Sequence, residues 1–246
     1  MELLAGYDPV QLAVALGAAI GAAFVRGLTG FGMAILLVPI LALALPPIEA
    51  VLVGNGLSLL IGLVEIRRLV RGAERSAFTV SAVCVLATPL GLLALAATGA
   101  DIARLIIALI AFSAFVAVLL PRRIKTPGPL TTGGVGLVSG LMTGYAGMPG
   151  PPVVPYYVGR NLPRETAKAS MMLIFTIAAG AGLASGTAMG VMAWRLALLS
   201  LLLFPAVMLG NWLGARSSGA ISDPVWRACV GVVLGGAAAA ALWRLL

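Results

Sequence analysis

Long apolar runs recur along the whole chain, and they constrain its fold more than any other feature. A helix needs about 20 residues to cross the hydrocarbon core of a bilayer. Five segments have that length, namely 77–97, 102–120, 166–186, 192–213 and 224–243. A sixth, 50–64, reaches it if its helix begins at Pro47, because proline favours the first helical turn. The pattern predicts an all-α polytopic membrane protein.

Composition agrees with this class and excludes others. Of the 246 residues, 61% are hydrophobic and 10% are charged, against about 25% charged residues in soluble domains. The net charge of +8 is concentrated in short segments between apolar runs, which is typical of membrane topology signals rather than of nucleic-acid binding. Histidine is absent and acids are few, which argues against metal sites and hydrolytic chemistry. We therefore expect no enzyme activity, no cofactor, no nucleic acid, and a lipid bilayer as the surroundings.

Two pairs of shorter apolar segments are each interrupted by a glycine-rich turn. In the first pair, 10–25 and 31–45 flank the turn G-L-T-G-F-G. In the second, 130–145 and 149–158 flank T-G-Y-A-G-M-P-G. Segments this short do not cross a bilayer singly. We therefore expect each pair to enter the membrane and return to its starting side as a broken-helix hairpin.

The two hairpins belong to an internal repeat. At an offset of 114, Thr29-Gly30-Phe31 matches Thr143-Gly144-Tyr145. An offset of 116 relates Val38-Pro39 to Val154-Pro155, Pro47 to Pro163, Glu49 to Glu165 and Pro89 to Pro205. Prolines and acids are scarce in membrane segments, so chance is a poor explanation. Each half is predicted to hold a hairpin followed by three transmembrane helices, with the first repeat at 1–120, a basic cytoplasmic linker at 121–129 and the second repeat at 130–246.

Basic residues orient the two repeats. Eleven of the 16 Lys and Arg residues lie in the segments 65–76, 121–129, 159–168 and 214–223. All four segments fall on one side if each hairpin returns to its starting face, and the positive-inside rule makes that side cytoplasmic. The second repeat is then inverted relative to the first. This predicts a multi-pass protein of a bacterial-type cytoplasmic (inner) membrane with both termini outside.

Inverted repeats with broken helices are a recurring transporter design, in which the substrate binds near the midplane where the breaks meet. The second helical piece of each hairpin begins near Phe31 or Pro149. A helix N-terminus exposes free N–H groups and a partial positive charge, and glycines let a ligand approach the backbone. Arg26 adds a full positive charge. Together these features predict an anion site.

We expect the anion to bind between the two breaks, with Arg26 compensating its charge. The hydroxyls of Thr29, Thr143 and Tyr145 would donate hydrogen bonds to its oxygens. The candidate substrate-binding residues are Arg26, Thr29, Gly30, Phe31, Gly32, Asn55, Thr143, Gly144, Tyr145, Gly147 and Met148.

Plainer alternatives stay open for these residues and for several others. The glycines could serve close helix packing, and Arg26 could reach towards the membrane interface. Polar residues within spans, such as Asn55, Ser58 and Asn211, commonly satisfy a neighbour instead of a substrate. Glu49 and Glu165 are interpreted as helix-start acids, with proton coupling as the alternative. Cys84 and Cys229 are interpreted as small apolar residues, with substrate contact as the alternative. The small-residue C-terminal segment leaves a homo-oligomer open.

Two motifs also carry a resemblance to a known family. The stretch G-L-T-G-F-G-M-A-I-L-L-V-P-I-L (27–41) resembles the first signature of the sulfite exporter TauE/SafE family of membrane permeases. The stretch G-L-V-S-G-L-M-T-G-Y-A-G-M-P-G-P-P (136–152) resembles its second. Length, duplicated halves and a basic central linker are similar too. The resemblance implies a secondary transporter for a small sulfur-containing anion, such as sulfite or an organosulfonate, working by alternating access. An anion channel and a carrier for a non-sulfur organic anion are the alternatives.

Overall fold

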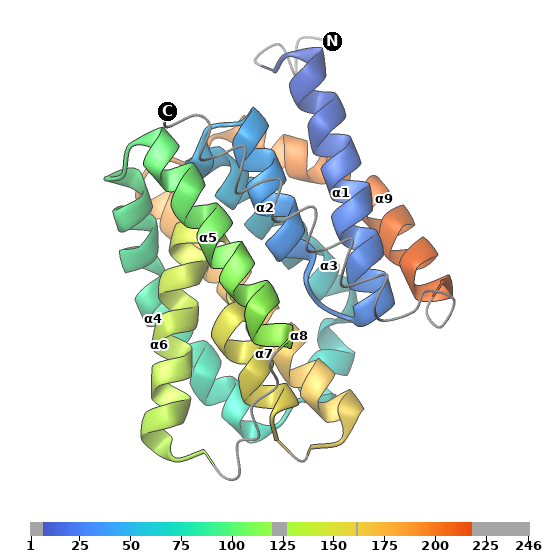
Figure 1. Cartoon of the computed structure of the whole chain (residues 1–246), viewed down its shortest axis with the longest axis vertical. Helices are drawn as coiled ribbons and strands as arrows, with labels where there is room; N and C mark the ends of the chain where they lie inside the picture. Colours follow the sequence, from blue (N-terminus) through green and yellow to red (C-terminus); the bar gives the residue numbers. More distant parts are fainter. Residues whose placement is uncertain (1–6, 120–126, 161, 218–246) are drawn as a thin grey trace.

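The chain folds into a bundle of α-helices (Figure 1). The computed structural model describes residues 7–119, 127–160 and 162–217, and these ranges contain nine helices and no strand. The helices are α1 Pro9–Thr29, α2 Met33–Ala44, α3 Pro47–Gly72, α4 Arg75–Ala96, α5 Ala100–Leu119, α6 Pro129–Ala146, α7 Gly150–Val158, α8 Arg164–Ala188 and α9 Trp194–Arg216. Of these, α1, α3, α4, α8 and α9 are long and apolar enough to cross a membrane. The predicted all-α membrane class is confirmed.

Two helices are longer than the apolar pattern predicts. α1 continues past residue 25 to Thr29 and has 21 residues, so by length and composition it could span a bilayer alone. α3 continues to Gly72, so most of the expected loop 65–76 is helical. Glu, Arg and Leu are good helix formers, and their charged ends can lie at the surface while the helix continues. The expected span 224–243 and most of the linker 121–129 lie outside the described residues.

Glycines in the left-handed conformation produce both breaks. Gly30 ends α1 at φ 86°, and its N–H donates to the Arg26 carbonyl at 2.6 Å. Gly32 precedes α2 at φ 92°, and Gly147 ends α6 at φ 66°. Other residues pay a steric cost for such φ values. In Figure 1 the α1–α2 hairpin opens towards the top of the molecule, and the α6–α7 hairpin opens towards the bottom.

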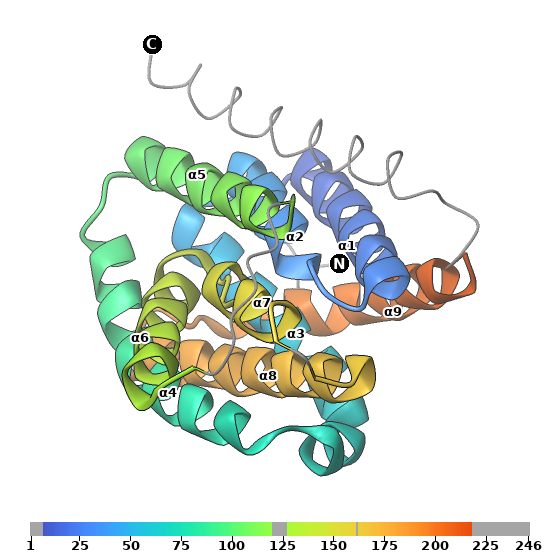
Figure 2. The same ribbon diagram turned by 60° about the horizontal axis from the view of Figure 1, so that its bottom comes forward.

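Helices of the first half pack against helices of the second half. α1 lies along α9 and α4 lies along α6, while α3 and α8 pack at the centre (Figures 1 and 2). The first two contacts are close because small residues line them: a Cβ at Gly214 would clash with the Phe24 carbonyl, and one at Gly144 with the Thr88 carbonyl. The matched prolines also fall in corresponding helices, with Pro39 inside α2, Pro155 inside α7, Pro89 inside α4 and Pro205 inside α9.

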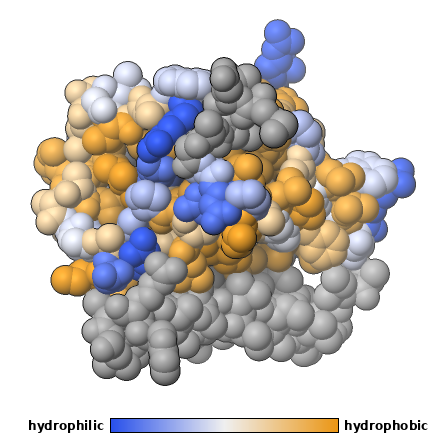
Figure 3. All heavy atoms as spheres, turned by 90° about the horizontal axis from the view of Figure 1, so that it is seen from above, coloured by the Kyte–Doolittle hydropathy of each residue, from blue (hydrophilic) through white to orange (hydrophobic). Residues whose placement is uncertain are grey.

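Burial differs between the central and the outer helices. In α3 and α8, 61% of the most apolar window is buried, against 33% in α1 and α9. The outer helices expose large apolar side chains, including Leu86 of α4 and Trp212 of α9, as expected for a lipid-facing surface. Figure 3 shows hydrophobic residues over much of the outline, with hydrophilic residues in separate groups. The central pair α3 and α8 is therefore surrounded mainly by other helices.

Candidate functional site

A cavity lies where the two breaks meet, between α3 and α8. The breaks and the helices that follow them contribute Phe31, Gly32, Met33, Ala34, Ile35, Gly147, Met148, Pro149, Gly150 and Val154 to its wall. The other lining residues are Arg26, Asn55, Ser58, Ile61, Gly62, Met172, Phe175, Thr176 and Ala179. The cavity offers about 50 Å³ to the centres of water molecules. Since one water needs roughly 10–15 Å³ by this measure, the space suits a few waters or a small anion.

Arg26 supplies the positive charge at one side of this cavity. It lies one turn before the end of α1, and only 7% of it is exposed. Its Nη1 donates to Asn211 Oδ1 at 2.8 Å. Its Nη2 lies 3.5 Å from Glu65 Oε1 and 3.4 Å from Met172 Sδ. The side chain therefore joins α1 to α3, α8 and α9.

The charge of Arg26 is only partly compensated by these neighbours. A guanidinium has five N–H donors, and it forms three contacts with the described residues. The contact with Glu65 is single and long, whereas strong carboxylate pairs are bidentate and about 2.7–2.9 Å. A thioether is a weak acceptor. Because a buried charge is costly without good partners, this geometry favours a further anion beside the guanidinium.

Asn55 of α3 lines the cavity and carries a buried amide nitrogen without a partner among the described residues. The residue is 1% exposed, and its Nδ2 has no hydrogen-bond partner in the described chain. A Cβ at Gly182 of α8 would clash with that nitrogen, and a Cβ at Gly147 would lie 3.7 Å from the Asn55 Oδ1. The amide thus sits between α8 and the second break. A buried amide without a partner costs free energy, so a ligand or a water is expected to accept from it.

The structure brings together six of the eleven predicted site residues: Arg26, Phe31, Gly32, Asn55, Gly147 and Met148 line the cavity. Thr29 and Thr143 lie behind it. The Thr29 hydroxyl contacts the Val25 and Phe31 carbonyls at 2.9 and 2.8 Å, which closes the first break. The Thr143 hydroxyl donates to the Ser139 carbonyl at 2.7 Å and faces Cys84. Both hydroxyls are occupied by the local backbone.

The other three predicted residues also lie away from the cavity wall. Gly144 is a packing position against α4. The Tyr145 hydroxyl is buried and has no partner among the described residues. Gly30 borders a neighbouring pocket, where the Lys168 side chain covers it. Cys84 does not border the cavity, and Cys229 lies outside the described residues.

Several cavity residues carry no motif and were missed by sequence reasoning. They come from two helix faces, with Gly62 on α3, and Met172, Phe175 and Thr176 on α8. Ser58, near Asn55 on α3, also lines the cavity and was named from the sequence only as a polar residue within a span. Spacings of three, four and seven residues place such positions on one side of a helix. A helical-face reading of α3 around Asn55 would have favoured Ser58 over the other polar residues and could have found Gly62. No sequence signal distinguishes the cavity face of α8 from its equally apolar neighbours.

A second pocket lies beyond Arg26. This vestibule holds about 250 Å³ and is lined by Arg26, Gly27, Gly30, Glu65, Arg68, Leu69, Glu165, Lys168, Ala169, Met172, Asn211 and Ala215. Two of these residues, Arg26 and Met172, also line the central cavity. They therefore form the partition between the two spaces. Most of its charged residues belong to the segments that the charge bias predicts to be cytoplasmic.

A polar clamp holds the outer end of the second hairpin. Arg160, just after α7, donates to both carboxylate oxygens of Glu74 at 2.7 and 2.8 Å. Ser76 bonds the Tyr157 hydroxyl at 2.8 Å. The hydrogen bonds from Arg160 lower the pKa of Glu74, and the hydrogen bond to Glu74 raises the pKa of Arg160. The clamp ties α7 to the start of α4 and so fixes one wall of the cavity.

Comparison with known proteins agrees with the motifs. A family model described as sulfite exporter TauE/SafE matches residues 14–241, which confirms the resemblance over most of the chain. No curated protein and no solved structure matches it significantly.

Proposed function

The chain belongs to the sulfite exporter TauE/SafE family, whose members are transporters rather than enzymes, and from this premise we propose that it carries a small sulfur oxyanion or organosulfonate across the cytoplasmic membrane. The observation that carries the proposal is the central cavity. Both helix breaks, a buried arginine and an unpaired buried amide border the same small space. Such a donor set suits an anion, and no carboxylate belongs to the cavity lining formed by the described residues.

The proposed anion accepts hydrogen bonds from Arg26 and from Asn55 Nδ2. The N-terminus of α2 adds free backbone N–H groups, because the first helical residues Met33, Ala34 and Ile35 have no partner within the helix and all three border the cavity. We place Thr29 and Thr143 behind this contact layer, where they support the breaks. Apolar residues such as Phe175 complete the wall and exclude water, which strengthens the interaction between anion and guanidinium.

Alternating access between two inverted repeats is the proposed mechanism. The opposite opening directions of the two hairpins (Figure 1) and the matched internal prolines support the inverted arrangement. Rocking of one half against the other would expose the cavity to each face in turn. Export needs no further coupling in a cell that is negative inside, since one negative charge gains about 2.3 kcal/mol per 100 mV on leaving.

Transport in liposomes tests the proposal. Sulfite, sulfate, thiosulfate, sulfoacetate and taurine are screened for saturable uptake and counterflow, and we expect counterflow of at least one oxyanion. Arg26→Gln should weaken its binding about 100-fold, since loss of a buried charged partner costs about 3 kcal/mol. Arg67→Gln is the matched control, because Arg67 is exposed and borders neither the cavity nor the vestibule. Conductance without saturation or counterflow would establish a channel, and inactivity towards all five compounds would reject the substrate class.

Cysteine labelling tests the inverted orientation separately. Pro46 and Pro163 precede α3 and α8 as N-caps, and both are exposed. Single cysteines are placed at these positions in a chain whose Cys84 and Cys229 are replaced by alanine. An impermeant thiol reagent should reach Pro163→Cys from the cytoplasmic face and Pro46→Cys from the opposite face. Labelling of both from one face contradicts the inverted repeat.

A further inference from the structure

Arg26 separates the central cavity from the vestibule, and besides the Met172 sulfur it contacts two side-chain oxygens at unequal distances. Asn211 accepts from Nη1 at 2.8 Å, which is a normal hydrogen bond. Glu65 lies 3.5 Å from Nη2 through one oxygen. Asn211 therefore fixes the position of the guanidinium, whereas Glu65 mainly neutralises its charge.

The vestibule carries a surplus of positive charge. Its cations are Arg26, Arg68 and Lys168, and its carboxylates are Glu65 and Glu165. Arg68 pairs with Glu165 at 2.9 Å, and Arg26 pairs with Glu65. Within the described ranges Lys168 forms no ion pair. One positive charge therefore stays uncompensated, and its side chain lies against Gly30 at the end of α1.

Glu65 is positioned to leave Arg26 when another anion arrives. Its side chain is 34% exposed, so its carboxylate can turn to water at little cost. The clamp shows the geometry of a lasting pair, since Glu74 binds Arg160 through both oxygens at 2.7 and 2.8 Å. Glu65 has one long contact and borders the vestibule but not the central cavity. An anion in the vestibule would meet the same guanidinium face.

We propose that the vestibule is a second anion position on the transport path and that Glu65 is an internal competitor for Arg26. The inference rests on the proposed function. A small oxyanion first associates with Lys168. It then displaces the Glu65 carboxylate from Nη2, and the guanidinium passes from an internal anion to the transported one. Between transport events Glu65 reoccupies Arg26 and keeps the buried charge paired.

Equilibrium binding of radiolabelled sulfite to the purified full chain tests this competition. Glu65→Gln removes the competing charge while keeping the side-chain shape, and we expect about tenfold tighter binding. Glu165→Gln is the matched control, because it removes a carboxylate from the same vestibule that pairs with Arg68 instead of Arg26. We expect this control to change the sulfite affinity by less than about twofold, since the pair of Glu165 with Arg68 is exposed and screened by salt. Lys168→Gln should weaken sulfite binding about threefold.

The outcomes separate the competitor role from the proposed function. Wild-type protein that neither binds sulfite nor moves any oxyanion of the transport screen defeats the proposed function. If the wild type binds sulfite, equal or weaker binding by Glu65→Gln overturns the competitor role alone. Equal tightening by Glu165→Gln also overturns it, because the effect would then be general electrostatics.

A second variant covers the case in which Glu65→Gln is not recovered as monodisperse protein. Glu65→Asp keeps the charge but shortens the side chain, so the already long contact with Arg26 is lost. It should tighten sulfite binding by about twofold to threefold. Failure of both variants to fold would identify Glu65 as a structural anchor and would overturn the proposal.

Discussion

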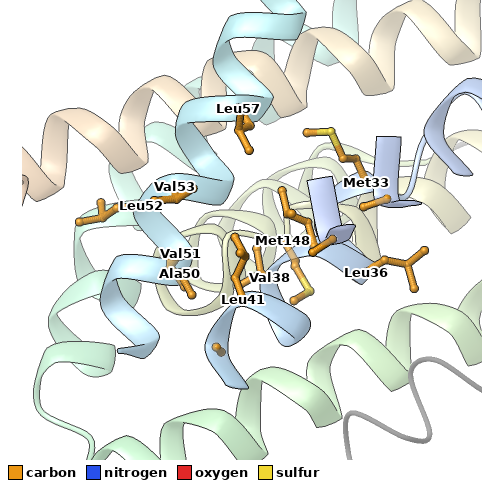
Figure 4. Packing of buried hydrophobic residues seen from close by; sticks show 14 of the residues in the cluster. Met33, Leu36, Val38, Leu41, Ala50, Val51, Leu52, Val53, Leu57 and Met148 are labelled. Carbon is orange, nitrogen blue, oxygen red and sulfur yellow. The ribbon is translucent and has the colours of Figure 1, made fainter. Parts of the chain in front are cut away.

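The first helix break places a charge beside the central cavity, whereas the second places an apolar plug against it. Arg26 precedes the first break by one turn, and the first N–H groups of the following helix α2 have no partner within that helix. At the second break Met148 is fully buried and lies among residues of α2 and α3 (Figure 4). Two of the first three residues of α7, Pro151 and Pro152, lack an N–H to offer an anion.

The matched positions of the two breaks show why the chemistry differs. At the offset of 114, the counterpart of Arg26 is Gly140. A Cβ at Gly140 would clash with the Cys84 carbonyl, because α6 packs directly against α4 there. No long side chain fits at that position. The match at this offset therefore keeps neither the charge nor the place of the break, since the counterpart of Gly30 is Gly144 inside α6, and Gly147 ends that helix.

The largest expected effect on stability concerns Met148 and distinguishes its packing role from the anion-binding role proposed for Arg26. Met148→Ala should lower the free energy of unfolding by about 3 kcal/mol, because it leaves a cavity in a packed region. Met208→Ala on α9 is the control; Met208 is 38% exposed, and a cost below about 1 kcal/mol is expected. Denaturation in detergent measures both. Oxyanion affinity of Met148→Ala should stay within about threefold of wild type. A loss as large as that of Arg26→Gln would show that the second break also binds the anion.

A smaller effect distinguishes the two left-handed glycines that line the cavity. Gly147→Ala should cost about 2 kcal/mol, since a Cβ in this conformation is strained and would lie 3.3 Å from Val38 Cγ2. Gly32→Ala should cost about 1 kcal/mol, because it carries the same backbone strain but the nearest atom would be 4.0 Å away. Thermal unfolding of the two variants gives the comparison. Equal losses would mean that backbone strain alone matters at both breaks.

The clamp on the second hairpin should have a measurable but modest effect. Arg160→Gln should lower the free energy of unfolding by about 1–2 kcal/mol, because it removes two charge-assisted hydrogen bonds in a part-buried site. Arg68→Gln breaks a pair whose side chains are 70% and 73% exposed, and less than about 0.5 kcal/mol is expected. The two variants are compared by denaturation at neutral pH. Equal losses of stability in the two variants would contradict the prediction that the clamp stabilises the fold more than an exposed ion pair does.

The smallest effect is the pH dependence of the same clamp. Arg160 lowers the pKa of Glu74 below its ordinary value of 4.5 in the folded protein. The ionised form is therefore favoured by folding, and its contribution to stability is complete above pH 4.5 and is lost as the pH falls through the folded pKa. Melting temperatures of wild type and Glu74→Gln should converge as the pH falls below 4.5. A constant difference across that range would contradict the assignment.

Much of the fold could be predicted from the sequence, because apolar length and glycine placement act locally. Within the described residues, the apolar runs long enough to cross a bilayer are helical, and Gly30, Gly32 and Gly147 adopt the left-handed conformations at the two breaks. The candidate site was harder to predict. Thr143 and Asn55 both appeared as polar residues in apolar surroundings. Only the direction of each side chain shows that Asn55 borders the cavity while Thr143 bonds its own helix.

By itself the sequence determined the class of protein, the family and the two helix breaks, since these depend on hydrophobicity, backbone freedom and motif order along the chain. Tertiary structure decided which residues share a space. Glu65 and Asn211 meet Arg26 across separations of 39 and 185 residues, and no local pattern encodes such partners. Helix rotation and crossing select them, because side chains on one helix reach a common cavity only when the packed faces point towards it.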